Sequence, residues 1–125
     1  DNSARLAAMR RRIQEIMRDD VSVVRSAESL TRAMAELDRL ADDASLEGAD
    51  LPARCTRDML ILAQEIAASA LEREESRGGH FRSDYPDTDP SLDGQHQLVA
   101  RSDSGVAERS FGDLATAWTG AVATR

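Results

Sequence analysis

Residues 59–71 constrain the fold of this chain more than any other stretch. A helix that is apolar nearly all round is buried on several sides. The sequence therefore predicts a central helix over residues 54–76, packed against other helices of the chain and with a side that could contact material outside it. The apolar positions are Met59, Leu60, Ile61, Leu62, Ala63, Ile66, Ala67, Ala68, Ala70 and Leu71.

Two amphipathic helices are predicted before this one, over residues 3–18 and from about residue 26 to residue 45, with Ser22 or Ser26 as the cap of the second. Aromatic residues make up 3% of the chain, so the core must consist of aliphatic side chains, which favours helices packed on helices. We expect an all-α fold, a spectrin-repeat-like three-helix bundle over residues 1–77. The stripes are Leu6, Met9, Ile13, Ile16 and Met17, then Ala27, Leu30, Met34, Leu37, Leu40 and Ala41.

The composition changes after residue 77. Gly78 and Gly79 are predicted to end the third helix, because glycine adopts the left-handed conformation that closes a helix. Turn formers and acids then predict an irregular arm over residues 78–94. Residues 95–125 are expected to form a small β-hairpin and a tail, packed on the bundle within a single domain. The predicted strands are residues 95–101 and 106–111, and Asp113 begins a short helix in the tail.

Charge and hydropathy exclude several classes of function. A net charge of −7 argues against nucleic acid as a partner. The longest apolar run, residues 59–63, is far shorter than a membrane span, and there is no signal peptide pattern. The single cysteine, Cys55, fits a reducing cytoplasm and is expected to be a small buried side chain. We therefore expect a cytoplasmic location.

Motifs for cofactors and metals fail on spacing. The glycines never form the phosphate-binding fingerprint of a dinucleotide fold, so this chain is not expected to hold FAD by itself. Asp87, Asp89 and Asp93 do not have the spacing of a calcium loop. His80 with Asp84 or His96 provides too few ligands for structural zinc. We predict no catalytic, cofactor-binding or metal-binding residue here.

Residues 74–86, which we name the elbow, carry the most specific pattern in the chain. Arginine pairs bidentately with carboxylates, so the arginines and acids of the elbow predict a fixed ionic cluster. It is interpreted in two ways that can both hold: an internal ionic lock that fastens the arm to the third helix, or a docking surface for a domain outside the chain. The candidate residues are Arg25, Glu75, Arg77, His80, Arg82, Asp84 and Tyr85.

The elbow sequence Glu-Ser-Arg-Gly-x-His-x-Arg-x-Asp-Tyr-Pro, residues 75–86, resembles the signature near the end of L-aspartate oxidases. These flavoproteins are related to the flavoprotein subunits of succinate dehydrogenase and fumarate reductase. A second block, residues 21–30, also resembles the C-terminal helical domain of that family, and the likeness extends over roughly residues 4–101.

The resemblance implies a C-terminal support domain of a larger FAD enzyme, and a start at Asp1 rather than Met fits a piece of a longer protein. The parent enzyme would oxidise L-aspartate to iminoaspartate in NAD biosynthesis, passing electrons to oxygen or fumarate. Its FAD-binding and capping domains, in the same polypeptide, would be the partners of this chain, which alone would be inactive. Two alternatives stay open: the equivalent domain of a succinate dehydrogenase or fumarate reductase flavoprotein, and a stand-alone helical protein-interaction module.

Overall fold

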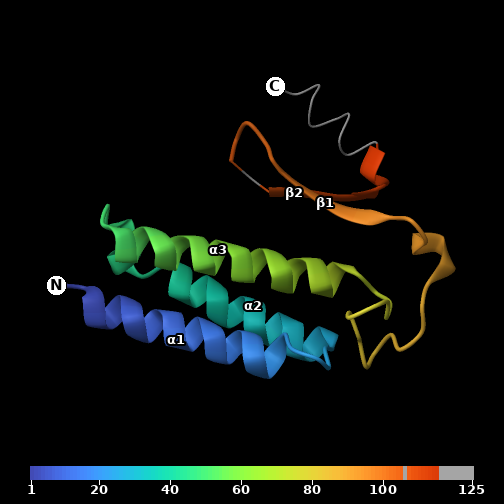
Figure 1. Cartoon of the computed structure of the whole chain (residues 1–125), viewed down its shortest axis with the longest axis horizontal. Coiled ribbons are helices and arrows are strands. Elements are labelled where there is room, and N and C mark those ends of the chain that lie inside the picture. Colours follow the sequence, from blue (N-terminus) through green and yellow to red (C-terminus); the bar gives the residue numbers. More distant parts are fainter. Residues whose placement is uncertain (106, 116–125) are drawn as a thin grey trace. The chain divides into compact units, whose positions relative to one another are not determined.

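A computed structural model describes residues 1–105 and 107–115 of the chain (Figure 1). The chain divides into two compact units, Asp1–Thr88 and Asp89–Arg125. The first unit contains three long helices and the elbow, and the second contains a β-hairpin.

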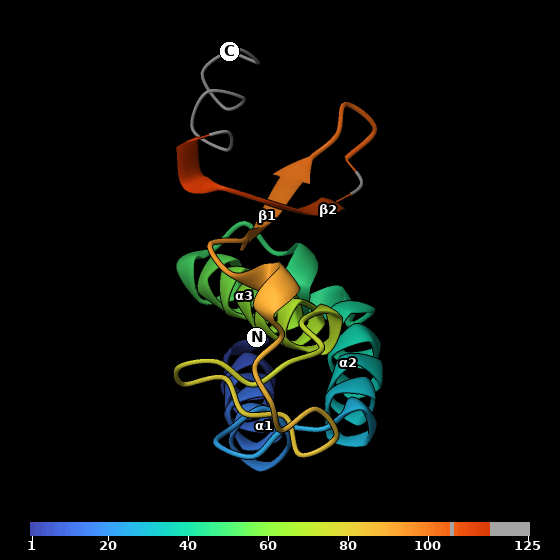
Figure 2. The same ribbon diagram turned by 90° about the vertical axis from the view of Figure 1, so that its right-hand side faces the viewer.

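Three helices form the predicted bundle, and each runs antiparallel to the one before it (Figures 1 and 2). They are α1 (Ser3–Asp20), α2 (Ala27–Ala41) and α3 (Leu51–Glu72). Each helix contacts the other two. The expected fold class, a helical bundle accompanied by a small hairpin, is confirmed.

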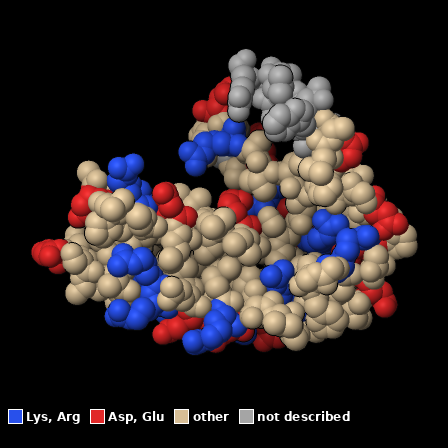
Figure 3. Space-filling view, in the orientation of Figure 1, with Lys and Arg blue, Asp and Glu red and all other residues tan. Residues whose placement is uncertain are grey.

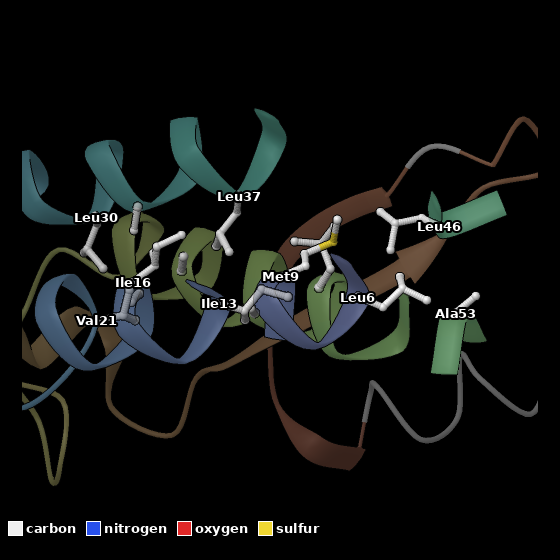
Figure 4. Packing of buried hydrophobic residues seen from close by; sticks show 14 residues of the cluster. Leu6, Met9, Ile13, Ile16, Val21, Leu30, Leu37, Leu46 and Ala53 are labelled. Atoms are coloured by element: carbon white, nitrogen blue, oxygen red, sulfur yellow. The ribbon is translucent and has the colours of Figure 1, made fainter. Parts of the chain in front are cut away.

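The core of the bundle is aliphatic, as the composition required (Figure 4). Leu30, Ala33, Leu37 and Ala67 are completely buried. From α3 the core receives mainly alanines, whose small side chains let the three helices approach closely. The buried hydrophobic residues are Leu6, Met9, Ile13, Ile16, Val21, Leu30, Ala33, Leu37, Leu46, Ala53, Leu60, Ala63, Ala67 and Ala70.

Helix α3 buries one stripe against α1 and α2, and the rest of its apolar surface faces outward. Ile61, Leu62 and Ile66 are 45%, 61% and 40% exposed. A groove lined by Met17, Met59 and neighbouring side chains lies between α1 and α3. Within the bundle as described, α3 is therefore not buried on several sides, because the two neighbouring helices cover only one side of it.

The helix caps follow the sequence closely. The Ser26 side chain accepts a hydrogen bond from the Ser29 amide, and the Ser29 side chain accepts one from the Ser26 amide, which makes a capping box at the start of α2. Asp50 caps α3 in the same manner through the Ala53 amide. Helix α2 ends earlier than predicted, and a 3-10 turn, η1 (Ala44–Glu47), follows it.

Two expectations about α3 were wrong. The helix ends at Glu72, and Arg73 after it is extended, so the two glycines do not cap it. Gly78, with a φ of 57°, instead lies in the turn between Arg77 and His80. Cys55 is exposed, because it falls outside the buried stripe of α3.

The second unit contains a 3-10 turn, η2 (Pro90–Leu92), and the antiparallel strands β1 (His96–Arg101) and β2 (Ala107–Gly112). The register pairs His96 with Gly112 and Arg101 with Ala107. Strand β1 begins one residue later than predicted, and the predicted start of the second strand, residue 106, lies outside the described residues. The expected tail helix falls mostly on residues 116–125, outside the described residues.

Acidic and basic side chains are interspersed on the face of the bundle drawn in Figure 3. Two ion pairs of the bundle join distant parts of the chain: Arg12 of α1 pairs with Glu36 of α2, and Arg5 of α1 pairs with Asp43 just after α2. In the part of the chain that the structure describes, no helix is long and apolar enough to cross a membrane.

Candidate functional site

The elbow lies where α3 ends and α2 begins, and it is joined there to residues 21–26 through the main chain. The Arg25 amide donates to the Phe81 carbonyl over 3.0 Å, and the Ser83 amide donates to the Arg25 carbonyl over 2.7 Å. Arg25 and Arg82 thereby form a parallel bridge. The two blocks that the sequence analysis singled out, residues 21–30 and 75–86, are therefore neighbours in the fold.

Arg82 is the buried centre of the elbow, with 1% of its surface exposed. Its Nη1 donates to the carbonyl oxygens of Ala70 at 3.0 Å, Leu71 at 2.8 Å and Arg73 at 3.3 Å. The carbonyls of Ala70 and Leu71 belong to the last turn of α3, where a helix has unpaired acceptors and a negative dipole end, and Arg73 directly follows the helix. A distant arginine therefore closes α3 in place of the glycine that the sequence suggested.

Asp84 accepts hydrogen bonds from the other two nitrogens of the Arg82 guanidinium. Arg82 Nε lies 2.9 Å from Asp84 Oδ1, and Nη2 lies 2.7 Å from Oδ2. Asp84 Oδ2 also accepts from the Ala27 amide at 3.0 Å, at the positive end of α2. These hydrogen bonds, that from Arg82 first, lower the pKa of Asp84 to about 2. The pair thus links the carboxyl end of α3 to the amino end of α2.

Glu75 is a fully buried carboxylate between two arginines. Arg73 Nε lies 2.7 Å from Glu75 Oε2, and Arg77 Nε lies 3.2 Å from each carboxylate oxygen. A buried charge is tolerated in a fold when it is paired and hydrogen-bonded in this way. Glu75 therefore fixes the chain between the end of α3 and the turn at Gly78.

His80 connects this cluster to Arg25. Its Nδ1 lies 2.9 Å from Arg25 Nη1, and its Nε2 lies 3.0 Å from the Arg73 carbonyl oxygen. A guanidinium can only donate, so Nδ1 is the acceptor and Nε2 carries the proton. Burial lowers the pKa of His80, the hydrogen bond to the Arg73 carbonyl opposes this, and the charges of Arg25, Arg82 and Arg73 lower it further. Burial also lowers the pKa of Arg25.

Ser76 organises the backbone of the elbow, although the sequence analysis did not single out its role. Its hydroxyl donates to the Tyr85 carbonyl over 2.8 Å and accepts from the Arg82 amide over 2.9 Å. Arg73 was also missed, since it precedes the elbow. Neither residue carries a local signal of its role, because their partners are fixed only once the elbow has folded back.

Four large apolar or aromatic side chains of the two joined segments are exposed. Val23 and Val24 are 76% and 60% exposed, and Phe81 and Tyr85 are 40% and 39% exposed. The Tyr85 ring centre lies 5.1 Å from Arg82 Cζ, a cation–π distance. Hydrogen bonding to Glu74 raises the pKa of Tyr85.

All seven predicted site residues lie in these two joined segments. Arg25, Glu75, Arg77, His80, Arg82 and Asp84 make polar contacts there, and Tyr85 stacks near the buried arginine. Among the described residues, no group of three or more His, Cys, Asp or Glu side chains is placed to hold a metal ion.

The fold and the elbow define a helical bundle domain tied together by the buried Arg82 and the ion pairs around it. The profile of the family described as "Fumarate reductase flavoprotein C-term" matches residues 10–117. The chain belongs to this family of flavoprotein oxidoreductases, as its C-terminal domain, which confirms the resemblance drawn from the sequence.

The relatives of this chain are of two kinds. A fumarate reductase (CoM/CoB) chain of Methanothermobacter marburgensis is 41% identical over 101 residues, which cover 72% of this chain and 18% of the relative. An L-aspartate oxidase of Rhodospirillum rubrum is 41% identical over 85 residues, 68% of this chain and 28% of the relative. The chain therefore corresponds to a minor part of each relative's length.

A solved structure agrees with the fold. Mycobacterium smegmatis Sdh1, in complex with UQ1, superposes with a TM-score of 0.66 at 27% identity. The match covers 90% of this chain and 20% of that one.

Proposed function

We propose that this chain is the C-terminal support domain of an L-aspartate oxidase. The whole enzyme would use FAD to oxidise L-aspartate to iminoaspartate, the entry into NAD synthesis. The observation that supports this most is the elbow: residues 75–86 follow the signature of that oxidase, and its charged residues form one connected structure with the block at residues 21–30.

The flavin would be held by parts of the polypeptide outside these residues. Gly78 follows the carboxyl end of α3, whereas a phosphate cradle needs glycine before the amino end of a helix. Arg73, Arg77 and Arg82 are already directed at Glu75 and Asp84. The described residues do not fit a dinucleotide cradle, so no step of the reaction is assigned to them. FAD would supply the hydride chemistry of the enzyme.

The elbow would act as a rigid base for docking the flavin-bearing part of the same polypeptide. The exposed Phe81 and Tyr85 of the elbow, with Val23 and Val24 of the joined segment, are side chains of the apolar and aromatic kind that dominates binding energy at interfaces. The buried lock beneath them fixes their backbone, which limits the entropy lost on docking. Most of the length of each relative lies outside the matched region, and this supports an occupant within the same chain.

The equivalent domain of a fumarate reductase or succinate dehydrogenase flavoprotein is the second candidate. It is favoured by the extent of the match to the Methanothermobacter fumarate reductase, 101 residues. A stand-alone interaction module is the third, with the same elbow surface binding a separate protein.

The assay that separates these candidates uses the complete protein encoded by the gene. We expect L-aspartate, and not succinate, to reduce its bound flavin under anaerobic conditions, with reoxidation by oxygen or fumarate. Flavin reduction by succinate alone would assign the chain to the second candidate. A complete protein without flavin would favour the third. Residues 1–125 alone should be colourless and inactive.

Docking through the elbow has its own test in the complete protein. Phe81→Ser should increase the rate of flavin loss and lower kcat, because the flavin domain loses an anchoring contact. Leu51→Ser is the matched control, since Leu51 is 68% exposed at the opposite end of α3. Equal effects of the two substitutions would contradict docking at the elbow.

A further inference from the structure

His80 is held in a position that excludes its protonated form. Its Nδ1 accepts from the Arg25 guanidinium at 2.9 Å, and its Nε2 donates to the Arg73 carbonyl at 3.0 Å. A proton on Nδ1 would place an N–H against an N–H and one positive charge against another. The contact to Arg25 therefore requires a neutral imidazole.

The charged groups around the His80 ring make its protonated form less favourable. Three cations face it: Arg25 from the segment before α2, Arg73 from the end of α3, and Arg82 from the elbow itself. Two carboxylates are close in the network, but each is paired with an arginine: Glu75 with Arg73 and Arg77, and Asp84 with Arg82. Burial first, and then the three cations, lower the pKa of His80 below its ordinary value, against the opposing effect of its hydrogen bond to the Arg73 carbonyl.

Arg25 transmits the state of His80 to the backbone. Its Nε donates to the carbonyl oxygens of Ser22 at 3.0 Å and Val21 at 3.3 Å, so its side chain braces the bend that leads into α2. Its own main chain makes both hydrogen bonds of the bridge, to Phe81 and Ser83. Loss of the contact to His80 removes one of the side-chain links between this bend and the elbow, the others being Asp84 to the Ala27 amide and the Ser83 hydroxyl to the Arg25 carbonyl.

We propose that His80 is an acid-sensitive latch, in which protonation at Nδ1 expels the Arg25 guanidinium and opens the main-chain bridge between residues 21–26 and the elbow. One proton is taken up by the imidazole, and Arg25 keeps its own. The exposed Val23 and Val24 lie in the segment that is released. The latch concerns contacts within this chain and does not rest on the proposed function.

Proton linkage gives the size of the effect. Between the pKa of the ordinary imidazole and that of the latched ring, the equilibrium for opening rises by about tenfold for each unit of pH lost. Above the ordinary pKa of histidine, the latch is closed and its stability does not depend on pH.

The test is an NMR titration of the 125-residue chain, which contains two histidines. His80 should titrate below the ordinary value for histidine from the Nε2–H tautomer. Over the same range, the amides of Arg25 and Ser83 should lose protection from hydrogen exchange, after correction for the intrinsic rate. Titration at or above the ordinary value, or protection that persists once His80 is protonated, would overturn the latch.

Two variants complete the design. His80→Gln offers an oxygen to Arg25 and an N–H to the Arg73 carbonyl but does not titrate, so the two amides should stay protected as the pH falls. His96→Gln, at an exposed position of β1, should keep the acid-induced opening of the wild type. Acid-induced loss of amide protection in a folded His80→Gln variant would overturn the proposal, and the wild-type titration decides the matter should that variant not fold.

Discussion

Arg82 and Asp84 form a two-point ion pair across one intervening residue, with contacts of 2.9 and 2.7 Å, while the third nitrogen of the same guanidinium closes the last turn of α3. One side chain thus satisfies acceptors from a helix end and from the elbow. Because Asp84 also accepts the Ala27 amide, the pair stabilises the ends of two helices together.

Replacing Arg82 should therefore unfold the elbow and weaken the bundle. Arg82→Ala leaves buried carbonyl oxygens at the end of α3 without their donor and Asp84 without its ion partner, and each buried acceptor left unsatisfied costs about 1–3 kcal/mol. Arg82→Lys should recover only part of the loss, since an ammonium cannot make the fork. Urea unfolding gives the free energy. Arg11→Ala, at an exposed position of α1, should remain near wild type, and an equal loss there would contradict the special role of Arg82.

Acid should destabilise the chain in part through Asp84. Its pKa is lowered from 3.8 to about 2 in the folded chain, so its contribution is complete above the unfolded pKa of 3.8 and is lost as the pH falls toward 2. Asp84→Asn should flatten the pH dependence of unfolding in that window and lower stability at neutral pH. Chemical unfolding at a series of pH values measures both effects. An unchanged acid limb in Asp84→Asn would show that other carboxylates account for it.

Asp43 provides a comparison for the acid limb. Its pKa is also lowered, first by the side-chain hydrogen bond from Arg5 and then by those from Ser45. Asp43→Asn should therefore flatten a separate part of the acid dependence of the unfolding free energy. The double variant should combine the two effects, because the sites share no hydrogen-bond partner among those described.

The two neighbouring glycines should respond in opposite ways to alanine. Gly78 has a φ of 57°, a conformation that costs an L-residue about 1–2 kcal/mol, so Gly78→Ala should destabilise by that amount. Gly79 has no positive φ, and an added Cβ would meet nothing within 4 Å. Gly79→Ala should be neutral or stabilise by up to about 1 kcal/mol through the unfolded chain. Equal losses in thermal unfolding would contradict this assignment of the turn.

Two leucines of α3 make a matched test of the core. Leu60 is 2% exposed and Leu62 is 61% exposed, so they lie on different faces of the same helix. Leu60→Ala should cost about 2–5 kcal/mol, because it removes packed methyl groups and leaves a cavity. Leu62→Ala should cost far less in the isolated chain. A comparable loss at Leu62 would indicate that the outer face of α3 is already covered, for instance by a second copy.

The sequence predicted the helices because their periodicity is local. Leu6, Ile13, Leu30 and Leu37 repeat at helical spacing, and all four are buried in the core. The Ser26 cap and the hairpin glycine near residue 105 also carried their signals in neighbouring residues. The bundle, the α2 cap and the hairpin could therefore be predicted within a few residues.

The end of α3 could not be predicted, because its cap comes from far along the chain. A glycine pair is the usual local signal for a helix end, whereas Arg82 reaches Ala70 only after the elbow has folded back. Cys55 was misplaced for a related reason. A free cysteine is commonly a small buried side chain, which suggested burial, but the buried stripe of α3 passes through Ala53 and Thr56 instead. Composition does not reveal which face of an apolar helix meets the core.

The main-chain bridge between Arg25 and Arg82 closes a long loop of the chain that contains α2 and α3. Because the two residues are distant in sequence, forming the bridge carries a loop-closure cost, and we expect it to form late in folding, after α2 and α3 have paired. A chain severed at the exposed Ala49, between those helices, is expected to remain assembled as two complementing fragments, since each fragment brings one half of the clasp.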